Sequence, residues 1–150
     1  MSTNTNPFGV TISTDDILDT LGFFDSWEER YKYIIDLGKE LPAMADNKKV
    51  EDNLVRGCQS QVWIEVYSNA GKLYFDVDSD AFIVKGLLGL VLAAYNAKTP
   101  EEITAFDIEA YFDQLALLKH LSPTRGNGIQ AMVRRVQDAA VNFSVNAPSS

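Results

Sequence analysis

The composition of the chain is that of an ordinary globular domain. Its 150 residues are 46% hydrophobic and 23% charged, which is enough to bury a core of normal size. The formal net charge of −8 and the pI near 4.5 count against a nucleic-acid-binding protein, which needs a basic surface to displace counterions from phosphates. We therefore expect a single domain over residues 1–150 with no nucleic-acid partner.

The chain has one cysteine and one histidine, so it cannot form an intramolecular disulfide and lacks the four Cys or His ligands of a structural zinc site. Its most apolar segment, residues 81–97, contains Lys85 and is shorter than the roughly 20 residues of a membrane-spanning helix. The first ten residues show no secretory signal. These features predict a cytoplasmic protein with no metal and no membrane partner, and loose tails over residues 1–10 and 145–150.

Two helices are predicted in the first third of the chain. Ser13 or Thr14 is a suitable N-cap for the first helix. Ser26 and Glu29 form a capping box before the second, "WEERYKYIIDLGKEL", whose apolar residues recur at helical spacing. Pro42 is expected to end that helix because proline cannot continue its hydrogen-bond ladder.

The middle of the chain changes to the two-residue period of β-strands. Residues 61–67, "QVWIEVY", and 72–77, "KLYFDV", alternate apolar and polar side chains, and "SNAGK" between them predicts a hairpin turn. Residues 53–56, "NLVR", are interpreted as a first strand. A sheet this small must be covered by helices on its apolar face.

Helices are predicted again after the sheet. Residues 81–97 are apolar on nearly all sides and predict the most deeply packed helix. Thr99 and Pro100 begin a short helix, an amphipathic segment follows over 107–121, and Ser122-Pro123 begins the last helix. The predicted fold class is α+β, with a small antiparallel three-stranded sheet flanked by helices.

Cys58 allows two interpretations on local grounds. A free cysteine is usually a buried and inert core residue. Gly57, however, permits backbone angles that are closed to other residues, and Gln59 and Ser60 are poor core neighbours. These residues place Cys58 between two strands, in a loop of the kind that carries reactive groups. The residues alone leave a structural and a reactive thiol equally open.

Other candidate sites are weaker. His120 could serve as the base of a Cys58/His120 thiol hydrolase, although its place at the end of an apolar helical run is more typical of a surface histidine. Asp76, Asp78 and Asp80 lack the later glutamate of a calcium loop. Residues 126–128, "GNG", follow no strand and lack a phosphate loop's lysine. Arg125, a cation in the first turn of a helix, suggests an anionic neighbour such as a thiolate.

Three motifs in this order resemble the SufE family of sulfur-acceptor proteins: "GCQSQVW", "DSDAFIVKGLL" and "LSPTRGNGIQAM". The similarity extends back through "WEERYKYIIDLGKELP" and covers most of the chain, from about Trp27 to Val136. The sister branch CsdE shares the architecture, so the sequence leaves the branch open. The resemblance implies a small antiparallel sheet flanked by helices, as in the IscU-type scaffolds.

The resemblance also implies a function. Members accept sulfane sulfur from a PLP-dependent cysteine desulfurase of the SufS or CsdA type, stimulate it, and pass the sulfur to an iron–sulfur scaffold or another acceptor. Cys58 matches the acceptor cysteine, which carries the sulfur as a transient persulfide; PLP belongs to the partner, and no cofactor is expected on this chain. The chain is thus expected to be a sulfur-transfer partner and not an enzyme.

Further site residues are predicted around Cys58. Arg125, in the third motif, is predicted to stabilise the thiolate or persulfide, with Arg56 as a second cation. The remaining residues are expected to shape the loop, to lie beneath it or to contact the partner: Gly57, Gln59, Ser60, Gln61, Trp63, Lys85 and Gly86. Simple packing is the alternative for Ser60, Gln61, Lys85 and Gly86.

Overall fold

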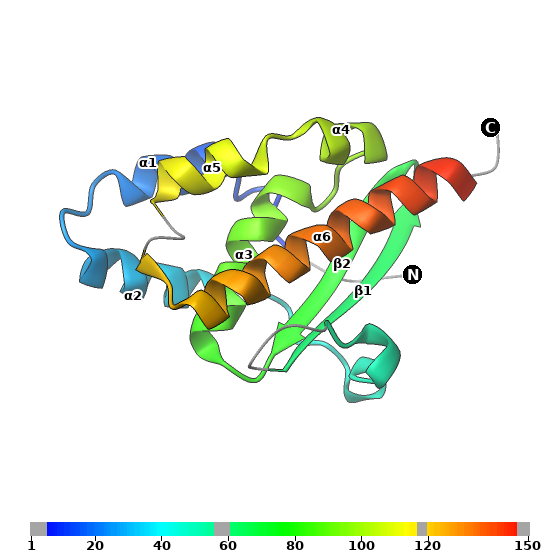
Figure 1. The fold of residues 1–150 in the computed structure, drawn as a ribbon, viewed down its shortest axis with the longest axis horizontal. Helices are drawn as coiled ribbons and strands as arrows, with labels where there is room; N and C mark the ends of the chain where they lie inside the picture. The colour runs from blue at the N-terminus through cyan, green and yellow to red at the C-terminus, as the bar shows by residue number, and fades with distance from the viewer. Residues whose placement is uncertain (1–5, 56–60, 117–119, 147–150) are drawn as a thin grey trace.

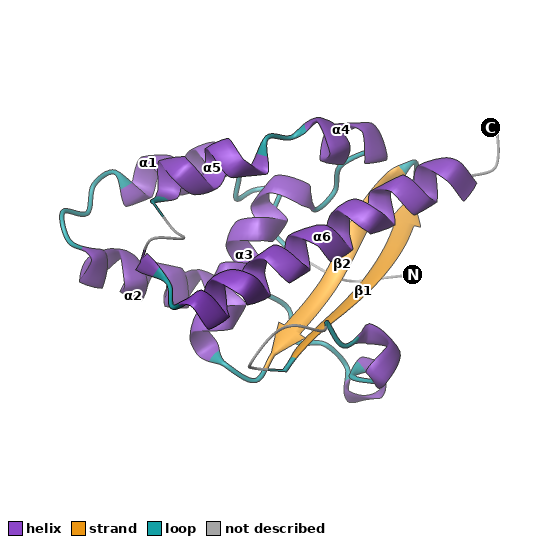
Figure 2. Cartoon of the chain, in the orientation of Figure 1, coloured by secondary structure: helices purple, strands orange, loops and turns teal. Residues whose placement is uncertain are grey.

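A two-stranded hairpin and six α-helices form the chain in a computed structural model that describes residues 6–55, 61–116 and 120–146 (Figures 1 and 2). For residues 124 and 144–146 it describes the backbone only. The elements are, in chain order, α1 (Thr14–Leu21), α2 (Trp27–Gly38), the 3₁₀ turns η1 (Asp46–Lys48) and η2 (Glu51–Asn53), β1 (Val62–Asn69), β2 (Lys72–Ser79), α3 (Phe82–Tyr95), α4 (Pro100–Ala105), α5 (Ile108–Leu115) and α6 (Pro123–Asn146). This combination confirms the predicted α+β class.

Strands β1 and β2 pair antiparallel, from Val62 opposite Ser79 to Asn69 opposite Lys72. Ala70 and Gly71 form the turn with φ of 55° and 81°, left-handed angles that match the twist of a tight hairpin. The alternation read from the sequence is confirmed, because one face is apolar and buried: Val62, Ile64, Leu73, Phe75 and Val77.

The predicted third strand is wrong for the described part of the chain, where the sheet has two strands. Residues 51–53 form the turn η2, and only Leu54 makes a bridge, to Trp63. The carbonyl of Leu54 accepts a hydrogen bond from Arg135 of α6 and not from a strand. An extended segment this short cannot add a ladder of its own.

Helix α3 fills the centre of the molecule, as its apolar sequence predicts, and packs on the apolar face of β2. Helix α2 packs along α3, and α6 packs on α3 and α4 (Figure 2). The buried stripe of α6 is the predicted one: Ile129, Met132, Val133 and Val136. None of the helices in the described ranges is long and apolar enough to cross a membrane.

Helices α2 and α3 touch through glycines. A Cβ atom on Gly38 would lie 2.7 Å from the backbone nitrogen of Gly86, and a Cβ atom on Gly86 would overlap the carbonyl oxygen of Ile34. Only glycine lets the two backbones approach this closely. The contact fixes the first turns of α3 against the end of α2.

The end of α2 and the N-terminal residues 6–10 both differ from the sequence prediction. Helix α2 starts at its predicted cap, Ser26, but ends at Gly38, because residues 39–41 tighten into i→i−3 bonds ahead of Pro42. The expectation of a loose tail over residues 1–10 does not hold for 6–10. Phe8 is completely buried, and its carbonyl accepts a hydrogen bond from Asn96 at 3.0 Å.

Candidate functional site

The two ends of the Cys58 segment, residues 56–60, are held at one end of the hairpin. Before the segment, the N–H of Val55 donates to the carbonyl of Val62 at 2.8 Å. After it, the N–H of Gln61 donates to Asp80 Oδ1 at 3.1 Å, and the N–H of Asp80 donates back to the Gln61 carbonyl at 3.3 Å. The chain therefore leaves and rejoins the described structure where β1 begins and β2 ends.

Asp78, one residue before the end of β2, forms hydrogen bonds and ion pairs with several groups at this end of the sheet. Its carboxylate is buried, with the residue 3% exposed, and accepts the N–H of Met44 at 3.2 Å and of Ser79 at 2.8 Å. Lys49 and Lys85 reach it at 3.3 and 3.4 Å. Asp78 thus connects the segment after α2, the end of the turn η1 and the start of α3.

The charge state of Asp78 follows from these contacts. Burial alone would raise the pKa of Asp78, but the N–H groups of Ser79 and Met44 and the two lysines outweigh it, so the pKa lies below its usual value. The carboxylate is therefore ionised at neutral pH and holds both lysines in place. Lys49 also lies over the ring of Trp63, 5.4 Å from its centroid, which fixes the indole on the outer face of β1.

Arg135 is a site residue that sequence reasoning missed. From α6 its guanidinium donates to the carbonyls of Leu54 at 3.2 Å and Asp52 at 2.9 Å, just before the Cys58 segment. The helical pattern indicates only that Arg135 lies next to the apolar face of its helix. Nothing in the sequence indicates which backbone carbonyls its guanidinium contacts.

The predicted site residues are only partly within the described structure. Arg56, Gly57, Cys58, Gln59 and Ser60 lie outside the described residues. Among the others, Gln61 bonds Asp80, Trp63 faces Asp78 across the hairpin, and Lys85 pairs with Asp78, so the structure brings these three to one end of the sheet. Gly86 contacts Ile34 of α2 instead, which accounts for it by packing.

Arg125 is exposed in the first turn of α6, where its N–H donates to Ser122 Oγ at 3.3 Å. A role of its guanidinium toward Cys58 stays a prediction. His120 stacks on Trp27, at the start of α2, with ring centroids 4.3 Å apart and planes 12° apart. Because Cys58 lies outside the described residues, a Cys58/His120 pair stays a prediction.

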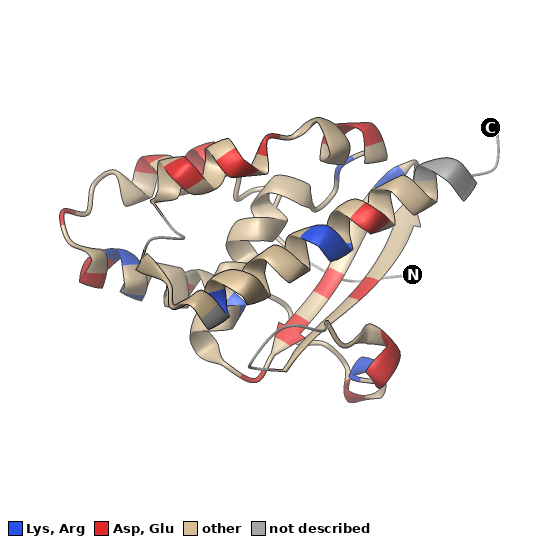
Figure 3. Cartoon of the chain, viewed as in Figure 1, with Lys and Arg blue, Asp and Glu red and all other residues tan. Residues whose placement is uncertain are grey.

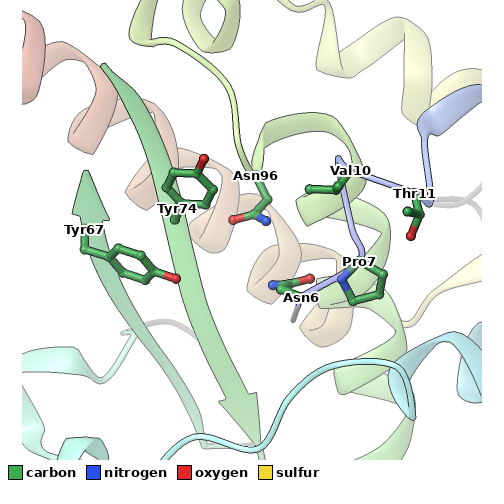
Figure 4. Close-up of a pocket in the computed structure, with 7 residues that line it drawn as sticks. All are labelled: Asn6, Pro7, Val10, Thr11, Tyr67, Tyr74 and Asn96. Atoms are coloured by element: carbon green, nitrogen blue, oxygen red, sulfur yellow. The ribbon is translucent and has the colours of Figure 1, made fainter. Parts of the chain in front are cut away.

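A pocket of about 260 Å³ lies at the far end of the hairpin, near its turn (Figure 4). Tyr67 and Tyr74 flank it with residues of the N-terminal segment, and Asn96 forms part of its wall. The Asn96 side chain is already bonded to the N–H of Phe75 and the carbonyl of Phe8. The pocket is explained by the way the N-terminal segment is fastened to the sheet.

Charge is unevenly distributed over the chain. Residues 6–29 and 99–116 contain eleven acidic and no basic residues, and the rest of the chain contains ten acidic and thirteen basic ones. Figure 3 shows acidic residues in α1, α4 and α5. The described residues contain no group of three or more His, Cys, Asp or Glu side chains that could hold a metal ion.

Comparisons with known proteins assign the family. The SufE profile, described as an Fe–S metabolism associated domain, matches residues 15–140. Uncharacterized SufE-like proteins of Rhizobium etli and Rhizobium meliloti are each 42% identical over 132 residues, which cover 85% of this chain and 89% and 94% of theirs.

A solved structure supports the fold. The solution structure of a hypothetical protein from Thermus thermophilus superposes with a TM-score of 0.72 at 18% identity, covering 89% of this chain and 96% of that one. The family profile ties the chain to iron–sulfur metabolism. On the profile and the two relatives together, this chain belongs to the SufE family.

Proposed function

We propose that this chain accepts sulfane sulfur on Cys58 from the persulfide of a PLP-dependent cysteine desulfurase, stimulates that enzyme, and passes the sulfur on for iron–sulfur cluster assembly in the cytoplasm. Membership of the SufE family carries this proposal, since Cys58 stands in its "GCQSQVW" motif. The described anchors on both sides of the segment support it, because a reactive group gains from a rigid frame.

The transfer is an exchange at sulfur. The Cys58 thiolate attacks the terminal sulfur of the partner's persulfide, a new S–S bond forms on Cys58, and the partner's S–S bond breaks. The partner cysteine leaves as a thiolate and takes up a proton. Since this chain has no second cysteine, no internal disulfide can trap the sulfur before it moves on. The chain needs no cofactor of its own for this step, and PLP stays with the desulfurase.

Arg125 and Arg56 are proposed to favour the anionic form of Cys58 and its persulfide. The thiolate fraction sets the rate of attack, and a nearby guanidinium raises that fraction. A CsdE-type acceptor that serves another sulfur-transfer pathway would use the same chemistry. The final recipient therefore does not alter the first step, which is the one to test.

Stimulation of a desulfurase tests the proposal. Sulfide release from cysteine and a reductant is measured with the desulfurase alone, with the wild-type chain, and with Cys58→Ser. Wild type is expected to accelerate turnover, and Cys58→Ser is expected to leave it at the level of the desulfurase alone. If Cys58→Ser stimulates as well as wild type, the proposal is wrong.

His120→Gln separates the carrier from the thiol hydrolase. A carrier needs no base at this position, and the ring lies on Trp27, so His120→Gln is expected to keep most of the stimulation. A hydrolase with a Cys58/His120 dyad would lose nearly all activity toward a thioester substrate. Near-complete loss of sulfur transfer in His120→Gln would overturn the assignment of the thiol to a carrier.

A further inference from the structure

Phe82 is a large apolar side chain left in solvent next to the Cys58 segment. It is the first residue of α3 and is 76% exposed. Two residues earlier, Asp80 bonds Gln61 through both its side chain and its backbone N–H. The aromatic ring therefore stands within a few residues of the point where the chain re-enters the described structure.

Single exposed apolar residues are normal on proteins, so exposure alone does not distinguish Phe82. Five large apolar side chains are strongly exposed in the described part: Val10, Phe23, Val50, Phe82 and Val141. Only two of these are aromatic, and Phe23 lies in the turn after α1, away from the hairpin. Phe82 alone combines an aromatic ring with attachment to the end of the sheet that carries the Cys58 segment.

The first turns of α3 form a rigid support for this ring. Gly86, one helical turn later, is pressed against Ile34 of α2. Lys85, a neighbour of Phe82 on the helix surface, is bonded to buried Asp78. A ring on a fixed backbone with two rotatable side-chain bonds loses little conformational entropy when it is buried by a partner, which is the property of aromatic anchors in interfaces.

The described lysines at this end of the sheet are held in ion pairs within the chain. Lys49 and Lys85 pair with Asp78, and Lys48 pairs with Glu65 at 2.7 Å. The exposed ring of Phe82 is therefore the apolar contact that this end offers to a partner.

We infer that Phe82 is the apolar anchor on which a cysteine desulfurase docks. The ring of Phe82 enters an apolar pocket of the enzyme, beside the enzyme's own persulfide-bearing segment. The inference rests on the proposed function and adds to it the partner-binding residue. Phe82 contacts the partner and not the sulfur, so it sets how tightly the two proteins bind and not how fast sulfur moves once they are bound.

A titration with a matched control tests the inference. A PLP-dependent cysteine desulfurase that the wild-type chain activates is titrated with wild type, Phe82→Ala, Phe82→Leu and Phe23→Ala. Phe82→Ala is expected to raise the half-saturating concentration about tenfold, the effect of losing one buried ring, while the rate at saturation stays that of wild type. Phe82→Leu should recover part of the affinity, and Phe23→Ala should match wild type.

Ionic strength distinguishes an apolar anchor from a change in charge or fold. Salt screens electrostatic attraction but does not affect the burial of a ring in the same way. The half-saturating concentration of Phe82→Ala divided by that of wild type should therefore be the same at low and high salt. Unchanged thermal unfolding will show that the variant folds.

If Phe82→Ala saturates like wild type, or if Phe23→Ala weakens binding equally, the inference is wrong while sulfur acceptance on Cys58 stands. A ratio that collapses at high salt also contradicts it. A wild-type chain that neither activates nor takes sulfur from any desulfurase tested would instead remove the proposed function itself.

Discussion

Asp78 and Asp76 lie two residues apart on the same face of β2, and their surroundings affect them in opposite ways. The pKa of Asp78 is lowered, since N–H groups and lysines outweigh its burial. The pKa of Asp76 is raised, chiefly by burial and also by Glu65 and Asp78, with Lys48 acting against this. The ionised form is thus favoured by the fold at Asp78 and disfavoured at Asp76.

Asp78→Asn is expected to destabilise the protein by about 1–3 kcal/mol at neutral pH, because a buried, multiply bonded carboxylate is replaced by an uncharged amide. Since the folded-state pKa lies below the usual 3.8, ionised Asp78 contributes stability above that pH and loses it as the pH falls through the folded-state pKa. Urea unfolding at about pH 7 and about pH 3 should show the two proteins converging in acid. An equal difference in the free energy of unfolding between the two proteins at both pH values would contradict this account.

Asp76→Asn is the control with the opposite sign. A carboxylate whose pKa the fold raises opposes folding when it is ionised, so its neutral replacement should leave the free energy of unfolding at neutral pH unchanged or larger. A loss as large as that of Asp78→Asn would show that the two positions do not differ in the way their contacts indicate.

Arg135→Gln tests the brace before the Cys58 segment. The change removes two charged hydrogen bonds, to the carbonyls of Leu54 and Asp52, and should let this part of the chain open locally. Hydrogen exchange at the Val55 amide is expected to rise about tenfold, which corresponds to one such bond. Arg134→Gln, at the exposed neighbouring position, should change nothing, and equal exchange in both variants would exclude the brace.

For single residues, the sequence predicts local roles such as helix capping better than it predicts contacts with residues far away in the chain. The capping residues Ser13, Ser26 and Thr99 could be predicted because a cap acts within three residues of itself. Asp78 was a candidate only for a weak calcium loop, since its partner Lys49 is 29 residues away in the chain and no local pattern connects them.

At the element scale the α2–α3 crossing gives a test in which two effects compete. Replacement of glycine by alanine in a helix normally stabilises by about 1 kcal/mol. At Gly86 the new Cβ atom would overlap the Ile34 carbonyl, so Gly86→Ala must separate the helices and should lower stability by about 1–3 kcal/mol. A higher melting temperature for Gly86→Ala would show that the helices are not in this close contact.

The hairpin could be predicted, although both strands run two residues further than expected, to Asn69 and Ser79, and the third strand could not. Alternation and the turn residues 70 and 71 specify β1 and β2 locally. Whether residues 53–55 extend or turn depends on η2 and on Arg135, which is 81 residues further along the chain and donates to the Leu54 carbonyl. Propensity in a short segment is overridden by such a distant contact.

For the whole molecule, the order of helices and the α+β class follow from periodicity, but the closure of the core does not. Phe8 fills a space against Gly89 of α3, where a Cβ atom would lie 2.8 Å from its ring. Asn96 then fastens the Phe8 carbonyl to β2. The composition of the first ten residues predicts a tail because it does not show the space that α3 leaves open.

The candidate site residues come from the family motifs, whereas the contacts that hold the two ends of the Cys58 segment are known only from the fold. The first and second motifs of the resemblance meet at the hairpin end, where Gln61 bonds Asp80 and Lys85 pairs with Asp78. Helices α1, α4 and α5, which contain seven of the 21 acidic residues and no basic one, lie away from that end (Figure 3).

The intact mass of the chain after incubation with a cysteine desulfurase and cysteine tests the central claim most directly. Because the chain has one cysteine, any added sulfur has a single possible site. The account predicts a gain of one sulfur atom that a reductant removes and that Cys58→Ser does not show. No gain on the wild-type chain, or an equal gain on Cys58→Ser, would contradict it.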